Sequence, residues 1–530
     1  MSEQGESAVA KTVKRVRGYR YSLVLEGIAV GAIAGLVAVL FRLAIQGADG
    51  LRGQAIAFCR ERGGWAVALW FLALAGAAGL VTLLLRWEPY ISGSGIPQVE
   101  GEMVGQVHQR WWRVLLCKFA GGLLSLGAGL SLGREGPSIQ LGAMAGKGFS
   151  RLTARIRTEE KLLMTCGASA GLAAAFNAPF AGVLFSLEEV HKNFSLDVLL
   201  PAMSASITAD FLSKNIFGLK PVFDLSVRQM LPIRHYWAVA LLGVALGLLG
   251  VLYNRCTSLA QDLYAHVRPA YLRTLIPFLL AGVLAFVAPQ LLGGGHALVE
   301  GIDPTATLGA VALLFGCKFL FSMASFGAGV PGGIFLPLLV LGSLVGAGFF
   351  AGLAPSLGLA PEMVDNFVIL GMAGYFAAIV RAPVTGILLI SEMTGSFTHM
   401  LTLSLVSLVA YATADLLGCK PVYDELLERL LKSRGRPLEP TGEKVLVAAP
   451  VCMGSPACGR TLSQIDWPAG SLVVSVRRGE RELVPGGATL LLQGDQLSLL
   501  CDESDIPAVR EAMARWCETA VREHRSPARQ

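Results

Sequence analysis

Long stretches without a charged residue are the feature that most limits what this chain can fold into. Residues 65–85, 237–253, 275–292 and 334–361 contain no Asp, Glu, Lys or Arg, and about 20 apolar residues suffice to cross a bilayer. Only 15% of the chain is charged, against about a quarter in soluble domains. The runs are continuous and longer than the alternating strands of about 10 residues in a β-barrel. They therefore predict a bundle of transmembrane helices.

Basic residues at the two ends of the apolar region indicate its orientation. Those before it are Lys11, Lys14, Arg15, Arg17 and Arg20, and those after it are Lys432, Arg434 and Arg436. Because Lys and Arg accumulate on the cytoplasmic side of membrane proteins, we expect both termini in the cytoplasm. The chain opens without a short apolar core and a small-residue cleavage site, so we expect no removable signal peptide.

The apolar region repeats itself. A shift of 200 residues aligns identical segments, namely 99–101 with 299–301, 117–119 with 317–319, and 127–129 with 327–329. A shift of 204 then aligns 178–179 with 382–383 and Glu188 with Glu392. Duplicated membrane transporters bind their substrate where the two halves meet, commonly at broken helices. With both termini in the cytoplasm, two halves with an odd number of crossings each would be inverted relative to one another.

Three glycine-rich segments interrupt the apolar pattern. They are Gly-Ser-Gly-Ile-Pro at 93–97, Gly-Arg-Glu-Gly-Pro at 133–137 and Gly-Gly-Ile-Phe-Leu-Pro at 332–337. Proline is favoured in the first turn of a helix, so each segment predicts a helix that begins inside the membrane. The free N–H groups and the positive ends of these helices would suit an anion. The alternative is that the glycines only allow close helix packing.

The three segments resemble the signature motifs of the CLC family of chloride channels and proton-coupled chloride antiporters, over roughly residues 20–430. The resemblance implies an all-α polytopic fold with an inverted repeat and broken helices. It also implies that the hydroxyls of Ser94 and Tyr423 and the N–H groups of Ile334 and Phe335 bind an anion. In the family, serine at the place of Ser94 accompanies a preference for chloride. For Tyr423 the alternative is a tyrosine at the membrane interface. The resemblance implies supporting roles for Gly93, Gly95, Gly133, Arg134 and Gly136.

Two glutamates carry the expected proton coupling. The resemblance makes Glu135 the gating residue, which competes with the anion and carries a proton. An ionisable group inside a membrane is costly unless it is used, and a carboxylate at a helix N-terminus can replace an anion. A structural cap is the alternative for Glu135. Antiporters of the family keep a second, cytoplasmic carboxylate that channels usually replace, and Glu189 fits that place, although a solvated helix end could also hold it. Glu188 is expected to have a supporting role.

Other polar residues match family positions without an expected part in binding. Glu100 and Lys118 lie in an apolar region, and we expect them to neutralise each other as a structural pair. Gln98 stands where some relatives have a second acid.

Two other functions fit parts of the sequence. Residues 167–171 spell Gly-Ala-Ser-Ala-Gly, the G-x-S-x-G pattern of serine hydrolases. A nucleophile elbow needs a strand-to-helix turn and a histidine base, and none of the seven histidines lies well inside a long apolar run. Small-residue helix packing explains the pattern better, so we expect no enzyme. The second alternative is a passive chloride channel of the same fold, which the sequence distinguishes only through Glu189.

The composition changes after Leu431. In chain order, we expect a basic cytosolic N-terminal tail at 1–20 and a transmembrane domain at 21–431. A linker at 432–444, a small α+β cytosolic domain at 445–520 and a tail at 521–530 follow. Residues 471–476 and 496–501 predict strands, 485–487 a turn and 507–517 a helix. The run 470–479, with Val-Pro at 484–485 and Gly-Asp at 494–495, resembles the C-terminal domain of RCK modules, also called TrkA-C. That resemblance implies dimerisation and a regulatory ligand such as a nucleotide; the alternative is a domain that only stabilises the dimer.

Together these features predict a secondary active transporter that exchanges chloride for protons. The family resemblance implies a homodimer with one anion pathway in each subunit, and the RCK-like tail favours a prokaryotic inner membrane. The expected partners are chloride, protons and the lipid bilayer, with no nucleic acid. The ten cysteines show no paired metal-ligand spacing. We therefore expect neither a metal nor an organic cofactor, and no disulfide framework.

Overall fold

The computed structural model describes residues 8–192, 194–219, 221–223, 225, 231–434, 444–479, 481–502 and 505–517. The chain divides into two compact units between Leu430 and Leu431. The first unit is helical, and the second contains a small sheet.

The first unit contains long apolar helices linked by short breaks. The helices are α1 (Ala8–Arg62), α2 (Gly64–Trp87), α3 (Ile96–Val104), α4 (Trp111–Gly127), α5 (Glu135–Leu152), α6 (Arg157–Phe176), α7 (Pro179–Phe185), α8 (Leu196–Phe217), α9 (Tyr236–His266), α10 (Ala270–Val287), α11 (His296–Glu300), α12 (Leu308–Gly327), α13 (Phe335–Leu357), α14 (Val364–Val380), α15 (Pro383–Thr394) and α16 (Met400–Leu416). A π-helical turn, η2 (Ser186–Val190), follows α7, and α17 (Val422–Lys432) crosses the division between the units. Residues 8–20, which we assigned to a tail, continue α1 as helix.

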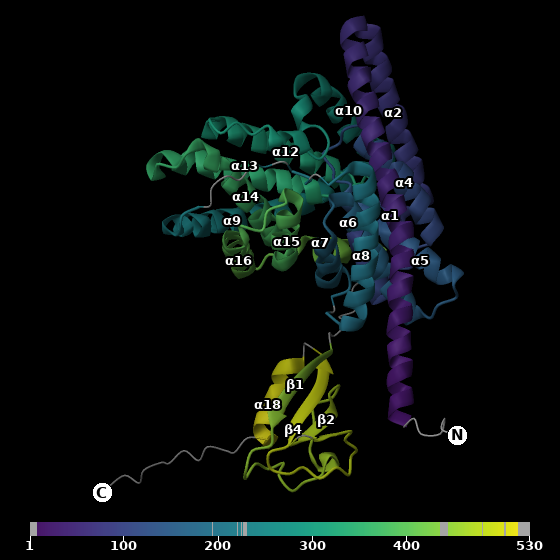
Figure 1. The fold of residues 1–530 in the computed structure, drawn as a ribbon, viewed down its shortest axis with the longest axis vertical. Helices are drawn as coiled ribbons and strands as arrows, with labels where there is room; N and C mark the ends of the chain where they lie inside the picture. The colour runs from purple at the N-terminus through teal and green to yellow at the C-terminus, as the bar shows by residue number, and fades with distance from the viewer. Residues whose placement is uncertain are drawn as a thin grey trace, which may run out of the picture. The chain divides into compact units, whose positions relative to one another are not determined.

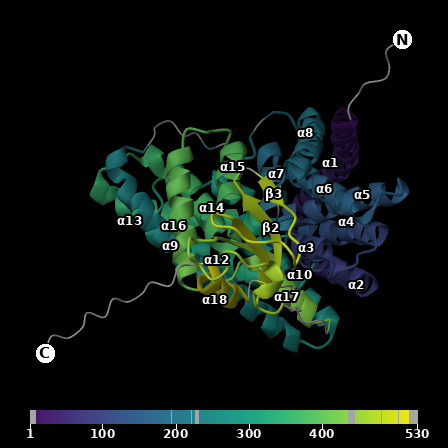
Figure 2. The same ribbon diagram turned by 90° about the horizontal axis from the view of Figure 1, so that it is seen from below.

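Eight segments of the described chain are long and apolar enough to cross a membrane, which confirms the predicted helical bundle. Their burial differs according to position. The segment Pro361–Val380, which includes α14, is 94% buried, whereas the segment of α2 is 22% buried. Accordingly α14 lies among α9, α13, α15 and α16 (Figure 2). An apolar helix with little burial, such as α2, has the surface expected of a helix that faces lipid.

Helices α1–α8 and α9–α16 form two matching halves, coloured purple to blue and teal to green in Figure 1. Contacts between the halves are reciprocal. The N–H of Gly93 donates to Gly329 O at 3.4 Å, and that of Gly293 donates to Gly129 O at 2.9 Å. Gly133 and Gly333 donate to each other, both at 2.7 Å, in an antiparallel bridge. Reciprocal contacts of this kind define a twofold axis, which here passes between these last two glycines. The predicted duplication is confirmed.

Glycines let corresponding helices of each half pack without a gap. A Cβ added to Gly142 of α5 would lie 2.1 Å from the carbonyl oxygen of Gly167 in α6. In the second half, a Cβ on Gly342 of α13 would lie 2.5 Å from the oxygen of Gly371 in α14. Gly167 begins the G-x-S-x-G pattern, which therefore lies inside a helix as packing residues. The strand-to-helix turn that a serine nucleophile needs is not formed there.

The second unit is a four-stranded antiparallel sheet with one helix. Its elements are β1 (Lys444–Pro450), β2 (Leu472–Arg478), β3 (Arg481–Leu483), β4 (Gln496–Asp502) and α18 (Ile506–Cys517), with strand order β1-β4-β2-β3. On β4, Leu497, Leu499 and Cys501 are fully buried, and they form a core with Val509 and Met513 of α18. The two predicted strands and the helix are confirmed to within two residues, whereas β1 and β3 were not predicted.

Candidate functional site

The three glycine-rich segments form the starts of three helices, as predicted, and they touch one another. Helix α3 begins at Ile96, α5 at Glu135 and α13 at Phe335. A Cβ on Gly136 would lie 2.7 Å from Ser94 O and 3.1 Å from Ser94 Oγ. A Cβ on Gly333 would lie 3.0 Å from the N atom of Gly136. Only glycine permits this convergence of helix N-termini from both halves.

None of these three helix starts is capped by its own N-cap side chain. The N-cap residues Gly95, Arg134 and Ile334 accept no hydrogen bond through a side chain. Gly93 and Gly95 have positive φ angles of 64° and 96°, which glycine adopts without strain. The first-turn N–H groups and the positive ends of the helix dipoles therefore suit a small anion at the convergence point.

Ser94 and Tyr423 supply two buried hydroxyls to this region. Ser94 is 2% exposed and accepts a hydrogen bond from Ile96 N–H at 3.1 Å, which leaves its own proton able to donate. Tyr423 is fully buried, and its hydroxyl has no hydrogen-bond partner among the described residues. Its ring meets the edge of Phe185 at 6.3 Å between centroids, and Phe185 meets Phe335 at 5.9 Å. A buried hydroxyl without a partner is costly, so it points to a missing ligand.

Glu135 lies at the junction of α5 and α13. It is fully buried, and neither carboxyl oxygen has a hydrogen-bond partner in the described part of the chain. A Cβ on Gly133 would lie 2.0 Å from Oε2, so the carboxyl is folded back over that glycine. It faces the N–H groups of Glu135 itself and Leu336. The carboxyl thus occupies a place where helix N-termini would otherwise receive an anion.

A polar cavity of about 360 Å³ reaches the residues beside Glu135. Its lining includes the guanidinium groups of Arg42 and Arg134, and its carboxylate, Asp49, pairs with Arg52 at 2.6 Å. Arg134 also donates to Ala175 O at 3.0 Å. The positive lining would concentrate anions beside Glu135.

Glu189 lies in the π-helical turn η2 and is 6% exposed. Its charged neighbours are Lys192, Glu100, Asp424 and Glu188. Both Glu189 and Glu135 are within electrostatic range of the Tyr423 hydroxyl.

The predicted ion pair between Glu100 and Lys118 is wrong. Glu100 Oε1 pairs with Lys192 Nζ at 2.5 Å, and Lys192 also pairs with Asp424 at 2.7 Å. Lys118 instead donates to the carbonyl oxygens of Ile91 at 2.9 Å and Gly93 at 2.6 Å. Lys118 therefore supports the first glycine-rich segment through its backbone.

Glu188 has a structural role that is shared with its repeat partner. Its Oε2 accepts hydrogen bonds from Thr385 N at 3.0 Å and Thr385 Oγ1 at 2.6 Å, at the start of α15. Glu392 accepts from Phe180 N at 3.2 Å and Ala181 N at 2.8 Å, at the start of α7. Each half thus supplies a carboxylate that caps a short helix of the other half.

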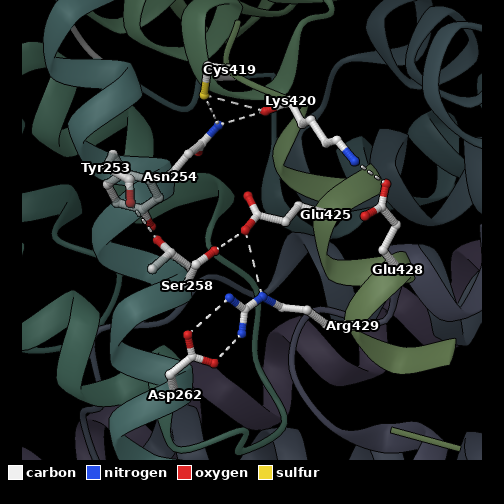
Figure 3. Close-up of polar contacts among 10 residues, drawn as sticks. Tyr253, Asn254, Ser258, Asp262, Cys419, Lys420, Glu425, Glu428 and Arg429 are labelled. Carbon is white, nitrogen blue, oxygen red and sulfur yellow. Dashed lines mark hydrogen bonds and ion pairs between the residues drawn. The ribbon is translucent and has the colours of Figure 1, made fainter. Parts of the chain in front are cut away.

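Polar contacts that sequence reasoning missed join α9 to α17, which carries Tyr423, and to Lys420 just before it (Figure 3). Arg429 donates to both carboxyl oxygens of Asp262, at 2.6 and 3.3 Å. Ser258 Oγ donates to Glu425, and Asn254 Nδ2 donates to Lys420 O at 3.1 Å. These contacts hold α17 against α9. The only sequence signal was the i,i+4 spacing of Glu425 and Arg429.

Comparison with known proteins identifies the family. A family model described as voltage gated chloride channel matches residues 75–415. The H(+)/Cl(-) exchange transporter ClcA of Vibrio campbellii is 37% identical over 430 residues, which cover 78% of this chain and 90% of the relative. This chain belongs to the CLC family. ClcA of Vibrio cholerae serotype O1 is 38% identical over 438 residues, covering 78% of this chain and 91% of the relative.

A solved CLC structure matches the same region, and the tail matches a second family. A slow cyanobacterial Cl⁻/H⁺ antiporter aligns with a TM-score of 0.73 and 32% identity, over 78% of this chain and 99% of that one. Residues 446–514 match the TrkA-C domain. The predicted CLC and TrkA-C resemblances are both confirmed. The chain is a multi-pass membrane protein of a transporter family and not an enzyme.

Proposed function

We propose that this protein is a secondary active transporter that exchanges chloride for protons across a membrane. The observation that carries the proposal is the buried carboxyl of Glu135, which faces the N–H groups of Glu135 and Leu336 and lies over Gly133 where α5 and α13 begin. A carboxylate there competes with chloride for the same N–H groups, and protonation removes its charge. One group thereby links the two fluxes. The curated relatives named above are H(+)/Cl(-) exchange transporters.

The chloride ion would bind where the three glycine-rich segments meet. Ser94 and Tyr423 would donate hydroxyl protons to it, and Ile334 and Phe335 would donate backbone N–H groups from the start of α13. Two observations support this assignment: the Tyr423 hydroxyl, which has no partner among the residues that the structure describes, and the contact between Gly136 and Ser94. Hydrogen bonds from neutral groups and helix dipoles stabilise an anion without binding it irreversibly.

Protons would take a path that joins the anion path at Glu135. From the cytoplasmic side, Glu189 would accept a proton and pass it toward Glu135. When Glu135 is protonated, it releases the N–H groups over Gly133 and chloride enters. Loss of the proton to the opposite side restores the carboxylate, which displaces chloride. A buried carboxyl at Glu189, beside the charged pair of Lys192 and Glu100, favours this exchange over a passive channel.

We also propose an assembly and a location for the protein. It would act as a homodimer with a pathway in each subunit, in a prokaryotic inner membrane, with both termini in the cytoplasm, where the basic flanks of the apolar region would lie. The TrkA-C domain would act as a regulatory unit that binds a small ligand such as a nucleotide.

The test is proton movement driven by a chloride gradient in liposomes that contain the purified protein. We expect uphill proton movement in the wild type, and its loss in Glu135→Gln and Glu189→Gln. Glu362→Gln changes an exposed glutamate and serves as the matched control. Chloride flux in the wild type without proton movement would make the protein a channel and would reduce Glu189 to a structural carboxylate.

A further inference from the structure

A second polar cavity, of about 620 Å³, lies away from the anion site, at the far ends of α3 and α5. Its volume is within the range of about 300–1,000 Å³ that is usual for small-molecule sites. Two carboxylates, Glu102 and Glu160, line it. The cations that line it are Arg110, Lys147, Arg151, Arg155, Arg157 and Lys161. The cavity is therefore strongly positive.

The carboxylates of the cavity are already satisfied by some of these cations. Glu102 pairs with Lys147, and Glu160 accepts a hydrogen bond from Arg151 at 2.9 Å. Arg155 pairs with Glu26, outside the cavity. Among the described residues, Arg110, Arg157 and Lys161 form no ion pair. In the described part of the chain, three of the six cations that line the cavity therefore have no ion-pair partner.

Two helix N-termini add to the positive field. Helix α4 begins at Trp111 and α6 at Arg157, and neither has a side-chain cap from its N-cap residue. Free N–H groups at helix starts bind phosphate oxygens, and arginine matches the planar geometry of a phosphate with paired hydrogen bonds. Leu152, the last residue of α5, and Ile156, just before α6, are 79% and 65% exposed. Exposed apolar side chains beside the cavity indicate that it lies near the membrane surface.

Buried hydrogen bonds connect the cavity to the anion site. Lys147, at the floor, donates to Gln109 O at 2.7 Å. Gln109 Oε1 accepts from Gln140 Nε2 at 2.7 Å. The Gln140 side chain packs on Gly95, where an added Cβ would lie 2.3 Å from Gln140 Oε1. Gly95 follows Ser94 directly, so a change at Lys147 can displace a residue of the proposed chloride site.

We propose that this cavity binds a ligand that carries phosphate groups and that the bound ligand alters chloride transport through Gln109 and Gln140. Two sources have the required chemistry, a soluble polyphosphate and the headgroup of an anionic phospholipid. The residues that line the cavity all belong to the transmembrane unit.

The first arm of the test measures binding of radiolabelled pyrophosphate to the full-length protein in detergent, by equilibrium dialysis. The double variant Arg157→Gln and Lys161→Gln removes two unpaired cations. Arg60→Gln and Arg86→Gln together form the matched control, because both arginines are exposed and lie outside the cavity. For a soluble ligand we expect binding that weakens with added salt and falls at least tenfold in the double variant only. Arg110→Gln is a second variant for the case that the double variant does not fold.

The second arm measures the phospholipid. For a lipid ligand we expect purified wild type to retain phosphatidylglycerol, and the double variant to lose it. Chloride transport should then differ between phosphatidylcholine vesicles with and without phosphatidylglycerol in the wild type, but not in the double variant. If neither probe binds, or if the double variant and its control bind both probes as the wild type does, the proposal is wrong. The binding results do not depend on whether the protein exchanges protons.

Discussion

Lys118 and Lys318 offer a test of how the first glycine-rich segment is held, because they are repeat partners with the same geometry. Both side chains are fully buried. Lys118 donates to Ile91 O and Gly93 O, and Lys318 donates to Leu291 O at 2.8 Å and Gly293 O at 2.7 Å. Only Gly93 lies next to Ser94. Replacement of either lysine by Met should therefore lower the stability of the protein, but only Lys118→Met should weaken chloride binding.

The size of both effects follows from the hydrogen bonds removed. A buried carbonyl left without a donor costs about 1–3 kcal/mol. Gly93 O still accepts from the N–H of Gly332 at 3.0 Å, so Lys118→Met leaves one carbonyl, that of Ile91, to carry this cost. Lys318→Met leaves the carbonyls of Leu291 and Gly293 and costs about 2–6 kcal/mol. Burial of an apolar side chain instead of an amine offsets part of this cost in both variants, and we expect a smaller net loss in Lys118→Met than in Lys318→Met. In Lys118→Met, a displacement of Ser94 that costs about 1 kcal/mol weakens chloride binding roughly fivefold.

The assay combines chloride titration calorimetry with thermal unfolding of the purified variants. We expect both variants to unfold at reduced temperatures, Lys318→Met at the lower one, and only Lys118→Met to bind chloride more weakly. Equal chloride affinities in the two variants would refute the argument that the carbonyl of Gly93 positions Ser94. A change confined to Lys318→Met would refute it more strongly.

Three further changes test other parts of the account. Lys192→Met leaves Glu100 without its cation, and we expect proton flux to fall at least threefold at unchanged chloride affinity in paired liposome and calorimetry measurements; a parallel loss of chloride affinity would contradict this. Glu188→Gln weakens the cap of α15, and thermal unfolding should show a loss of about 1–2 kcal/mol; unchanged stability would argue against the cap. In the TrkA-C domain, burial alone would raise the pKa of Asp495, but hydrogen bonds from Arg478 and a backbone N–H lower it below its usual range. The stability that Asp495 contributes is therefore present above its ordinary pKa of about 4 and is lost as the pH falls through the lowered value. Urea denaturation of residues 431–530 between pH 6 and pH 3 should show this loss in the wild type and less of it in Asp495→Asn; equal pH dependence in both would contradict the assignment.

Local sequence rules predicted the centre of the transmembrane unit well. Glycine and proline at 93–97, 133–137 and 332–337 determine where α3, α5 and α13 begin, because backbone conformation and the missing proline N–H act within a few residues. The sequence showed the repeat only where one constant shift in residue number aligns the two halves. Gly31 of α1 packs on Ala205 as Gly243 of α9 packs on Val409. The number of residues between the two members differs between the pairs, because the connecting segments differ in length. Sequence comparison alone therefore did not identify the two pairs as equivalent.

Side-chain partners far apart in the chain could not be predicted. Glu100 and Lys118 were paired because both are charged residues in an apolar region, but burial does not specify which partner is nearest. Lys192 reaches Glu100 across 92 positions from a backbone with a φ of 52°, which no local pattern indicates. The contact between Arg429 and Asp262 spans 167 positions. Such pairs depend on how helices from different parts of the chain cross.

The potential at which net ion flux stops in liposomes tests the central claim most directly. It should be measured at a fixed chloride gradient while the pH gradient is varied. If chloride is exchanged for protons through Glu135, the zero-flux potential shifts with the pH gradient, and the shift disappears in Glu135→Gln. A zero-flux potential that stays at the chloride equilibrium value at every pH gradient would contradict proton coupling.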